Sequence, residues 1–405
     1  MSKLVRQVPV FAPYFNHRES DLINKSLQSG WVAQGPMVAD FENAVAAHEG
    51  ASHAVAVSSC TTALHMAMVA MGLEARHDIF VPSFTFVATA NAAEYIGATP
   101  VLVDVRTDTY CICPAAIESE ISKNYTRENN GKLTNRQTGK ELFGIVAVGL
   151  FGILADMPAI NAIAEKYNLN ILEDNACALG AKIEGVTFRK NPACLSFHAR
   201  KSITTGEGGM VLTNDDALAD KLRKLRSHGA SISEIARHQN HGFLMPDYNE
   251  LGYNYRLSDI QAAMGVAQME KFDEIVEKKC TVAARYDTIL PTIAPFLKTP
   301  HTPTGYFHTY QSYVVMVDCK DVEKGNEIRN KFMTFLEERG ISTRQGTHAV
   351  HLLGYYREKY GYEADSLPGA YACDKLSIAL PLYAGLSEND QDYVTETISE
   401  ARRMF

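Results

Sequence analysis

The feature that most constrains the fold of this chain is the alternation, through its first two thirds, of short apolar runs with helical patterns. The run at 53–58 is typical of a strand, and the helical pattern at 61–72 follows it directly. Continuous apolar runs between helices indicate parallel strands covered on both faces. We therefore predict an α/β fold around a mostly parallel sheet. Further strands are expected at 78–82, 99–105, 142–149 and 169–174, and further helices at 86–97 and 157–168.

A polar stretch at 123–141 interrupts this alternation. Its strong turn signal is Asn129-Asn130-Gly131, and we predict a surface hairpin to which no chemistry is assigned.

Beyond the alternating region, a long helical pattern runs from Ser258 to about Leu290 and stops at Pro291. We expect it to connect to a second domain with a strand at 311–318, a helix at 323–339, a strand after Gly340 and a final helix from Ser387. The chain is therefore predicted to divide into a large domain (1–257), a connecting helix (258–290) and a smaller α/β domain (291–405).

Charge and cysteine usage exclude several classes of protein. The formal net charge is -8 and no block of lysine and arginine occurs, which argues against binding to nucleic acid or to an anionic membrane. Eight cysteines are scattered without a CxxC pair, so we expect reduced thiols rather than a zinc site or a disulfide framework. Neither a signal sequence nor a stretch of membrane-spanning length is visible. We expect a cytoplasmic protein without a metal.

Asp174 directly follows the apolar run 169–173. Ligands of open α/β sheets bind beyond the carboxyl ends of the strands, where this carboxylate is expected to lie. Taken alone, a helix N-cap is the simpler interpretation of this aspartate. Its neighbour Glu173 is expected to face away, because adjacent strand residues point to opposite sides.

A second candidate site is the junction at 57–62, where a strand ends, small hydroxyl residues follow and a helix begins. Free backbone N–H groups at a helix start bind phosphate well, and Ser59, Cys60 and Thr61 would surround such an anion. An ordinary serine or threonine cap explains the segment equally well.

Lys201 lies in the segment SFHARKSITTGEGGM, residues 196–210. A buried and partly desolvated lysine has a lowered pKa and becomes a nucleophile that forms Schiff bases. The glycines that follow allow close backbone approach around it. Without the other two segments, a surface lysine in a glycine-rich loop is the simpler interpretation.

Together the three segments form a specific set. A phosphate cradle, an aspartate for a protonated pyridine nitrogen and a lysine for an aldehyde are what pyridoxal 5'-phosphate requires. Phe84 and Phe86 offer an aromatic ring for the face of the cofactor.

From about Trp31 to its C-terminus, the chain resembles the DegT/StrS-type aminotransferases, which act on nucleotide-linked keto sugars and have the aspartate aminotransferase fold. The resemblance rests on seven segments in order: SGWVAQGPMVADFE, SSCTTALHMA, VPSFTFVATANA, LEDNACALGA, SFHARKSITTGEGGM, LRSHG and GYNYRLSDIQAA. It implies fold type I, with a mostly parallel seven-stranded sheet between helices in the large domain and a smaller α/β C-terminal domain.

The resemblance also implies roles for single residues. Lys201 is similar to the Schiff-base lysine, which also moves the proton, and Asp174 to the pyridinium partner. The resemblance places the cofactor phosphate at Ser196, Thr61 and the backbone of Cys60, and the cofactor ring against Phe86. Asn254 matches a residue that reaches the phosphate of the neighbouring subunit, which implies a homodimer with shared active sites.

Two positions depart from the family pattern. Cys177 lies where family members often carry glutamine or histidine near the ring hydroxyl, so that contact is expected to be missing or made by water. Cys60 replaces a glycine of the phosphate turn.

On the substrate side the resemblance is less informative. It suggests His198, Arg256, Trp31 and His308, and a cationic arginine suits a diphosphate. For each of them a purely structural role is a close alternative.

We therefore expect transfer of an amino group from L-glutamate, which leaves as 2-oxoglutarate, to a nucleotide-linked keto sugar of deoxysugar or polysaccharide biosynthesis. A 4-keto-6-deoxyhexose is the favoured acceptor. Related sugar dehydratases carry histidine at the lysine position, so Lys201 favours transamination. The alternatives are an aminotransferase for a cyclitol or ketoacid, and a non-catalytic regulatory or accessory protein that binds pyridoxal phosphate.

Overall fold

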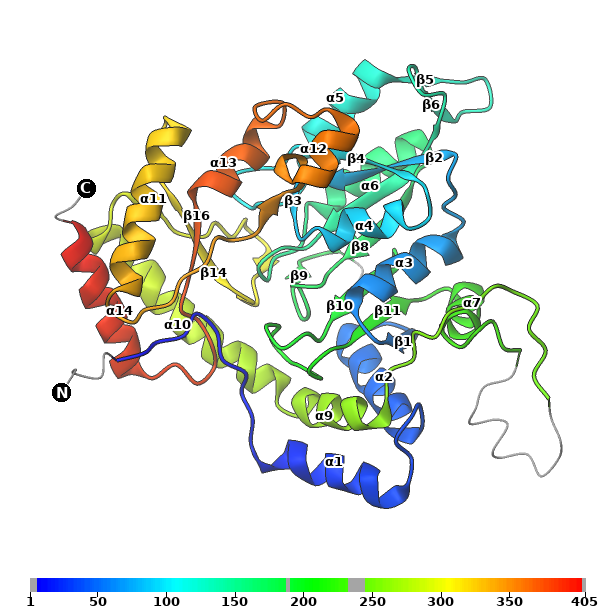
Figure 1. Ribbon diagram of the computed structural model, residues 1–405, viewed down its shortest axis with the longest axis horizontal. Helices are drawn as coiled ribbons and strands as arrows, with labels where there is room; N and C mark the ends of the chain where they lie inside the picture. Colours follow the sequence, from blue (N-terminus) through cyan, green and yellow to red (C-terminus); the bar gives the residue numbers. More distant parts are fainter. Residues whose placement is uncertain (1–5, 187–189, 232–244, 403–405) are drawn as a thin grey trace.

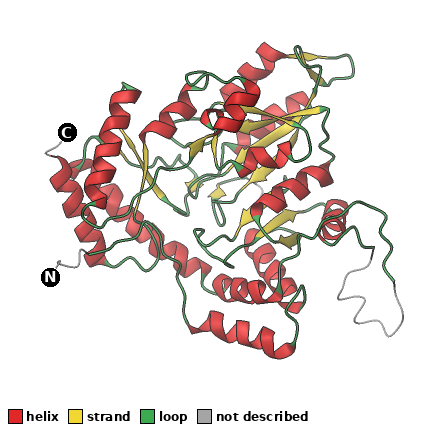
Figure 2. Cartoon of the chain, in the orientation of Figure 1, coloured by secondary structure: helices red, strands yellow, loops and turns green. Residues whose placement is uncertain are grey.

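Figure 1 shows the computed structural model of the chain, which describes residues 6–186, 190–231 and 245–402. Its largest sheet has the strand order β1-β11-β10-β8-β7-β2-β4, with helices on both sides (Figure 2). The seven strands are β1 (His53–Val57), β2 (His77–Pro82), β4 (Thr99–Val103), β7 (Glu141–Val148), β8 (Asn170–Asp174), β10 (Ala193–Ser196) and β11 (Gly209–Thr213).

Parallel pairing joins β10, β8, β7, β2 and β4, whereas β11 runs antiparallel between β10 and β1. The predicted mostly parallel sheet is therefore confirmed, and the seven strands named above are the main path of a sheet of nine. β5 (Tyr125–Arg127) and β6 (Leu133–Asn135) form an antiparallel hairpin that pairs with the amino end of β7. This is the hairpin predicted at 123–141, and it projects from the sheet in Figure 1.

Alternate side chains of the sheet pack against different helices. Val55 and Val57 of β1 belong to a core that includes α3, whereas Ala54 and Ala56 belong to a core that includes α2. This two-sided burial explains why the strands are continuously apolar. One face is covered by α1 (His17–Ser29), α2 (Pro36–Glu49) and α9 (Asp259–Met269), and the other by α3 (Cys60–Met71), α4 (Ala88–Glu94), α5 (Pro114–Asn124), α6 (Met157–Tyr167) and α7 (Asp216–Arg226).

A smaller antiparallel sheet has its own core, to which Tyr286, Tyr313 and Phe332 contribute fully buried rings. It consists of β12 (Leu297–Lys298), β14 (Tyr313–Val317) and β16 (Ser377–Leu380), packed with α10 (Phe272–Ile293), α11 (Val322–Glu337), α13 (Pro368–Leu376) and α14 (Glu388–Ala401). The remaining elements are β3 (Phe84–Thr85) paired with β15 (His348–Ala349), β9 (Lys182–Ile183) paired with β13 (Tyr306–Phe307), α12 (Gly354–Tyr360) and the 3-10 turn Val350–Leu352.

The single helix predicted from Ser258 to Leu290 is wrong in detail, because the chain forms two helices, α9 and α10. The break falls at Glu270 and Lys271, where Lys271 adopts a non-helical conformation and caps α10. Pro291 does not end α10, since a proline near the last turn removes only one N–H bond and Ala294 still donates to the carbonyl of Leu290. The predicted domain boundaries at 257/258 and 290/291 stay predictions.

The strand expected after Gly340 is reduced to isolated bridges, which pair Ile341 with Val8 and Arg344 with Ala379. The third strand of the small sheet is β16, which the sequence argument did not identify. The predicted final helix is confirmed as α14, with Ser387 as its N-cap. Among the described residues no helix combines the length and the apolar character needed to cross a membrane.

Candidate active site

The carboxyl edge of the large sheet brings three of the predicted segments together. Asp174 ends β8 and Ser196 ends β10, which lies beside β8 in parallel. The end of β1 leads through Ser58 and Ser59 into α3. Because these strand ends lie at one edge, the aspartate and the start of α3 face the same space.

Asp174 is 3% exposed and accepts two short hydrogen bonds. Thr89 Oγ1 donates to Asp174 Oδ2 at 2.7 Å, and the Ala176 N–H donates to Oδ1 at 3.2 Å. The thiol of Cys60 lies 3.9 Å from Oδ1. Burial raises the pKa of the Asp174 carboxyl, while the Thr89 and Ala176 hydrogen bonds and the charge of Lys201 oppose that rise. The site therefore holds a deeply buried carboxyl that a cationic ligand would stabilise in its charged form.

Glu173 lies on the opposite face of the sheet from Asp174, as expected. Its carboxylate accepts from Asn175 Nδ2 at 2.8 Å and from Asn191 Nδ2 at 3.3 Å. Two adjacent acidic residues are thus separated by the alternation of the strand.

The start of α3 has a side-chain cap, but its first N–H groups have no partners within the helix. Ser59 accepts from the Thr62 N–H and Thr62 Oγ1 accepts from the Ser59 N–H, which is the ordinary cap considered above. The N–H groups of Cys60 and Thr61 lie in the first turn, where a helix offers no partners of its own. The backbone of Gly209 lies directly against this turn. A Cβ at Gly209 would be 2.3 Å from both the carbonyl carbon and the carbonyl oxygen of Ser59, so only glycine fits there.

Lys201 lies at the tip of the loop between β10 and β11. Backbone hydrogen bonds close this loop from Phe197 to Gly208 and from Ala199 to Gly206, and the Lys201 N–H donates to His198 O at 2.9 Å. Ser196, at the base of the loop, is in register with Gly209. The glycines thus let the loop fold back tightly towards α3.

The Lys201 amine donates to Cys177 Sγ at 2.9 Å. Burial disfavours its charged form, but the hydrogen bond and electrostatic interaction with Cys177, together with the nearby Cys60 and Asp174, outweigh burial and raise the pKa of Lys201. The lowered pKa expected from burial is therefore wrong for the protein without a ligand. Burial raises the pKa of the Cys60 thiol, so that thiol is protonated near neutral pH.

Phe86 and Asn254 are both exposed. Phe86 is 62% exposed directly after the buried strand β3, so its ring is available to a ligand or another chain. Asn254 forms an isolated β-bridge with Ser227. The backbone carbonyl of the next residue, Tyr255, accepts a hydrogen bond from the Ser58 N–H at 2.9 Å. Asn254 thus lies close to the approach to α3 but on the surface of the molecule.

Three of the predicted substrate-side residues lie on separate segments. His198 is in the Lys201 loop, where its Nδ1 accepts from the Arg200 N–H at 3.2 Å. Arg256 donates to Ser227 Oγ at 3.2 Å and forms a bridge with Val57. Trp31 lies between α1 and α2, and its backbone carbonyl accepts a hydrogen bond from Ser26 Oγ at 2.8 Å.

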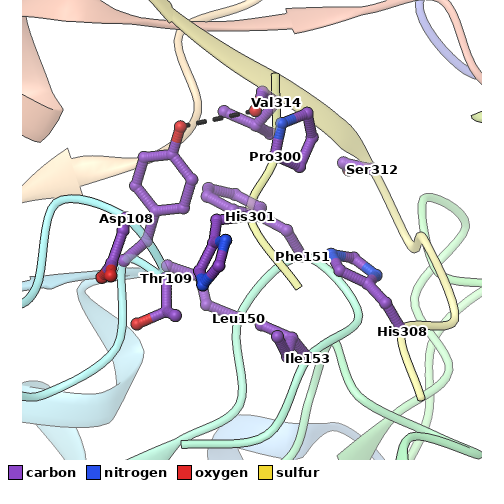
Figure 3. A pocket seen from close by; sticks show the side chains of 11 residues that line it. Asp108, Thr109, Leu150, Phe151, Ile153, Pro300, His301, His308, Ser312 and Val314 are labelled. Carbon is purple, nitrogen blue, oxygen red and sulfur yellow. Dashed lines mark hydrogen bonds between the residues drawn. The ribbon is translucent and has the colours of Figure 1, made fainter. Parts of the chain in front are cut away.

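His308 is 6% exposed and lines a small cavity with Phe151, Ile153 and Ser312 (Figure 3). The cavity volume of about 10 Å³ has room for about one water molecule and none for a sugar. His308 Nδ1 accepts from the Tyr310 N–H at 2.8 Å, and burial lowers the pKa of His308 to about 3. These contacts are those of a neutral structural histidine, and a role towards substrate stays a prediction.

Sequence reasoning missed three residues around this site. Thr89 supports Asp174, Gly209 permits the approach to α3, and Lys279 lies buried behind the Lys201 loop. Gly209 was visible in the glycine-rich segment, whereas nothing local distinguishes Thr89 or Lys279. Among the described residues no group of three or more histidine, cysteine or acidic side chains is arranged to hold a metal.

Comparisons with known proteins show the family of the chain. The model of the DegT/DnrJ/EryC1/StrS aminotransferase family matches residues 13–399. The chain is 34% identical over 403 residues to GDP-perosamine synthase of Caulobacter vibrioides, covering 99% of each chain. It is 33% identical over 396 residues to the spore coat polysaccharide biosynthesis protein SpsC of Bacillus subtilis, covering 97% of this chain and 96% of that one.

Among solved structures, an aminotransferase of the same family from Brucella abortus superposes with a TM-score of 0.81 at 30% identity, covering 95% of each chain. The predicted fold type I of pyridoxal phosphate-dependent aminotransferases is thereby confirmed.

Proposed function

Because the chain is an aminotransferase that belongs to the DegT/DnrJ/EryC1/StrS family, we propose that it uses pyridoxal 5'-phosphate to aminate a nucleotide-linked keto sugar. L-Glutamate is the proposed donor, and a 4-keto-6-deoxyhexose is the favoured acceptor. The observation that carries the proposal is the convergence of Asp174, Lys201 and the start of α3 at one edge of the sheet.

The residues present fit this cofactor. Asp174 is a buried carboxyl that gains from a cation such as a protonated pyridine nitrogen. The first turn of α3 presents N–H groups to an anion, and Gly209 leaves the backbone space that any side chain would fill. We assign Ser196, Thr61 and the Cys60 N–H to the phosphate, and Phe86 to one face of the ring.

When bound, the cofactor supplies an aldehyde that holds an amine covalently and a ring that accepts electrons from the substrate carbon. Lys201 holds the cofactor and then, once its amine is released, removes and returns a proton at the reacting carbon. Cys177 Sγ lies 2.9 Å from the Lys201 nitrogen, so this thiol orients the amine while it is free.

Asp174 keeps the ring nitrogen protonated, and Thr89 keeps Asp174 in place. The Thr89 hydroxyl, which lies 3.0 Å from Thr85 Oγ1, donates to the carboxylate at 2.7 Å. A cation paired with Asp174 also cancels the charge that helps to raise the pKa of Lys201. Occupation of the site therefore favours the neutral, reactive form of the lysine.

The exposed position of Asn254 supports a homodimer in which this residue reaches the phosphate of the partner's site. The exposure of Phe86, at 62%, is likewise explained if a ligand and a second chain cover it. We also propose a cytoplasmic location, since all eight cysteines are free thiols.

Two relatives support a nucleotide-linked acceptor by their names, which refer to GDP-perosamine and to a coat polysaccharide. Arg256 is the proposed diphosphate contact, because a guanidinium forms paired hydrogen bonds with phosphate oxygens. We assign Trp31 and His198 to the sugar side of the pocket, and His308 to its supporting wall.

The first experiment is to purify the protein with pyridoxal phosphate, record the visible absorption spectrum and add L-glutamate alone. We expect a cofactor band that glutamate converts to the spectrum of pyridoxamine phosphate, with release of 2-oxoglutarate. A panel of nucleotide-linked keto sugars then identifies the acceptor.

Other outcomes select the alternatives. A bound cofactor that ignores glutamate contradicts the donor assignment. Turnover of a cyclitol ketone or ketoacid without any nucleotide replaces the sugar assignment. Cofactor binding without amine transfer from any donor supports a regulatory or accessory protein.

A further inference from the structure

A second buried lysine, Lys279, lies behind the loop that carries Lys201. It belongs to α10 and is 1% exposed. Its amine donates to Ser202 Oγ at 3.1 Å and to the Gln311 carbonyl at 3.2 Å. Within the described ranges no carboxylate forms an ion pair with it, so this cation is buried among neutral acceptors.

Such a position is costly for the fold. Desolvation disfavours the charged form of a buried amine that has no counter-charge. Burial accordingly lowers the pKa of Lys279 to about 7, although Cys280 and Cys177 act against the shift. A methionine of similar length would fill this space without that cost. The hydrogen bonds of Lys279 are thus the feature that distinguishes it from an apolar core residue.

Those hydrogen bonds act on both neighbours of Lys201. Lys279 holds the side chain of Ser202, and Gln311 Nε2 donates to the carbonyl of Arg200 at 2.9 Å. Lys279 in turn holds the backbone carbonyl of Gln311, which precedes β14 of the small sheet. The tip of the loop, residues 200–202, is therefore tied to α10 and to the small sheet.

We propose that Lys279 is a positioning residue which, together with Gln311, fixes residues 200–202 and so aims the amine of Lys201 at the reacting carbon. The expected effect on kcat rests on the proposed function, whereas the expected effect on the rigidity of the loop does not. Lys279 does not touch substrate or cofactor in this proposal, and it acts through Ser202 and Gln311.

The test compares Lys279→Met with Lys278→Met. The neighbouring Lys278 is a matched control, since it points outwards to Glu274 and Tyr14. In the cofactor-free protein we expect hydrogen exchange of amides 199–206 to become about tenfold faster in Lys279→Met only. In the loaded enzyme we expect kcat to fall about tenfold to hundredfold, with KM for glutamate nearly unchanged.

Ser202→Ala provides a second route to the same answer, because it removes only one hydroxyl. It is expected to lower kcat about twofold to tenfold. Combined with Lys279→Met, it should add less than its separate effect, since both variants break the same hydrogen bond.

A folded Lys279→Met protein with normal exchange at 199–206 and normal kcat would overturn the inference. If that variant does not fold, unchanged exchange and kcat in Ser202→Ala overturn it instead. Failure of the wild-type protein to bind the cofactor or to accept an amino group refutes the proposed function, whereas the exchange result still decides whether Lys279 holds the loop.

Discussion

The two sides of the candidate site differ in how the fold holds them. On the cofactor side, Asp174 ends a buried strand, and Cys177 and Lys201 are in direct contact. On the substrate side, Trp31 and Arg256 lie on separate segments, where they form hydrogen bonds with Ser26 and Ser227. One side is built on strand ends and on the loops that leave them directly, and the other is spread over segments farther along the chain from these strand ends.

This difference shows which part of the chemistry a single chain determines. Groups at strand ends are placed by the backbone hydrogen bonds of the sheet, which any ligand meets already formed. Residues on connecting segments take their final positions from neighbouring loops and, in the proposed dimer, from the partner. We therefore expect substitutions on the cofactor side to lower turnover and those on the substrate side to weaken acceptor binding.

The largest effect is expected for Lys201→Ala. Loss of the amine should lower the transamination rate about 10⁴-fold, because Lys201 is both the proposed nucleophile that holds the cofactor and the proposed proton-transferring group. The rate is measured as 2-oxoglutarate release, and circular dichroism checks the fold. A folded variant with near-normal turnover contradicts the assignment of Lys201.

Asp174→Asn should lower the rate of the glutamate half-reaction about 10²-fold to 10³-fold, because the amide cannot stabilise a cationic ring nitrogen. Glu173→Gln is the matched control, since this carboxylate binds Asn175 and Asn191 on the other face of the sheet. Stopped-flow absorbance measures both variants. Equal losses in the two would indicate damage to the strand rather than a role at the ring.

Thr89→Val is expected to lower the same rate about tenfold, because it removes the hydroxyl that donates to Asp174 Oδ2. The pKa of the Asp174 carboxyl should rise further above its ordinary value, so the loss of rate should increase as the pH falls. A pH profile identical in shape to that of the wild type would argue against support of Asp174 by Thr89.

Arg256→Gln tests the substrate side. We expect KM for the nucleotide-linked acceptor to rise about tenfold, while the half-reaction with glutamate stays within about twofold. Arg223→Gln serves as a control, because Arg223 is a surface arginine paired with Asp220. A clearly lower rate of the glutamate half-reaction in Arg256→Gln would instead assign Arg256 to the cofactor side of the site.

The smallest effect is expected for Cys177→Ala in the cofactor-free protein. Since the contact with Cys177 raises the pKa of Lys201, removal of this thiol should lower that pKa. The charged lysine contributes stability that is present below its ordinary pKa of 10.5 and is lost as the pH rises through its raised pKa. In the variant this loss of stability therefore begins at lower pH. Labelling of the Lys201 amine against pH, read by peptide mass, measures the change. An unchanged midpoint contradicts this origin of the shift.

The fold class followed from local sequence. The roles of Asp174 and Lys201 were predicted only from three segments taken together and from the family resemblance. The continuous apolar runs at 53–58 and 169–174 indicated buried strands, and the alternation of the strand placed Asp174 and Glu173 on opposite faces of the sheet. The hairpin at 123–141 was likewise visible as a turn signal between polar residues. Such signals depend on neighbours along the chain, which a single sequence contains.

Only the tertiary structure decided what surrounds those residues. Thr89 and Asp174 are 85 residues apart, and Lys279 and Ser202 are 77 apart, so neither pairing leaves a local pattern. The raised pKa of Lys201 has the same origin, because it depends on Cys60, Asp174 and Cys177, which come from two segments far from Lys201 in the sequence. Periodicity along the chain determines which residues face inwards, whereas the packing of sheet, loop and α10 determines which of them meet.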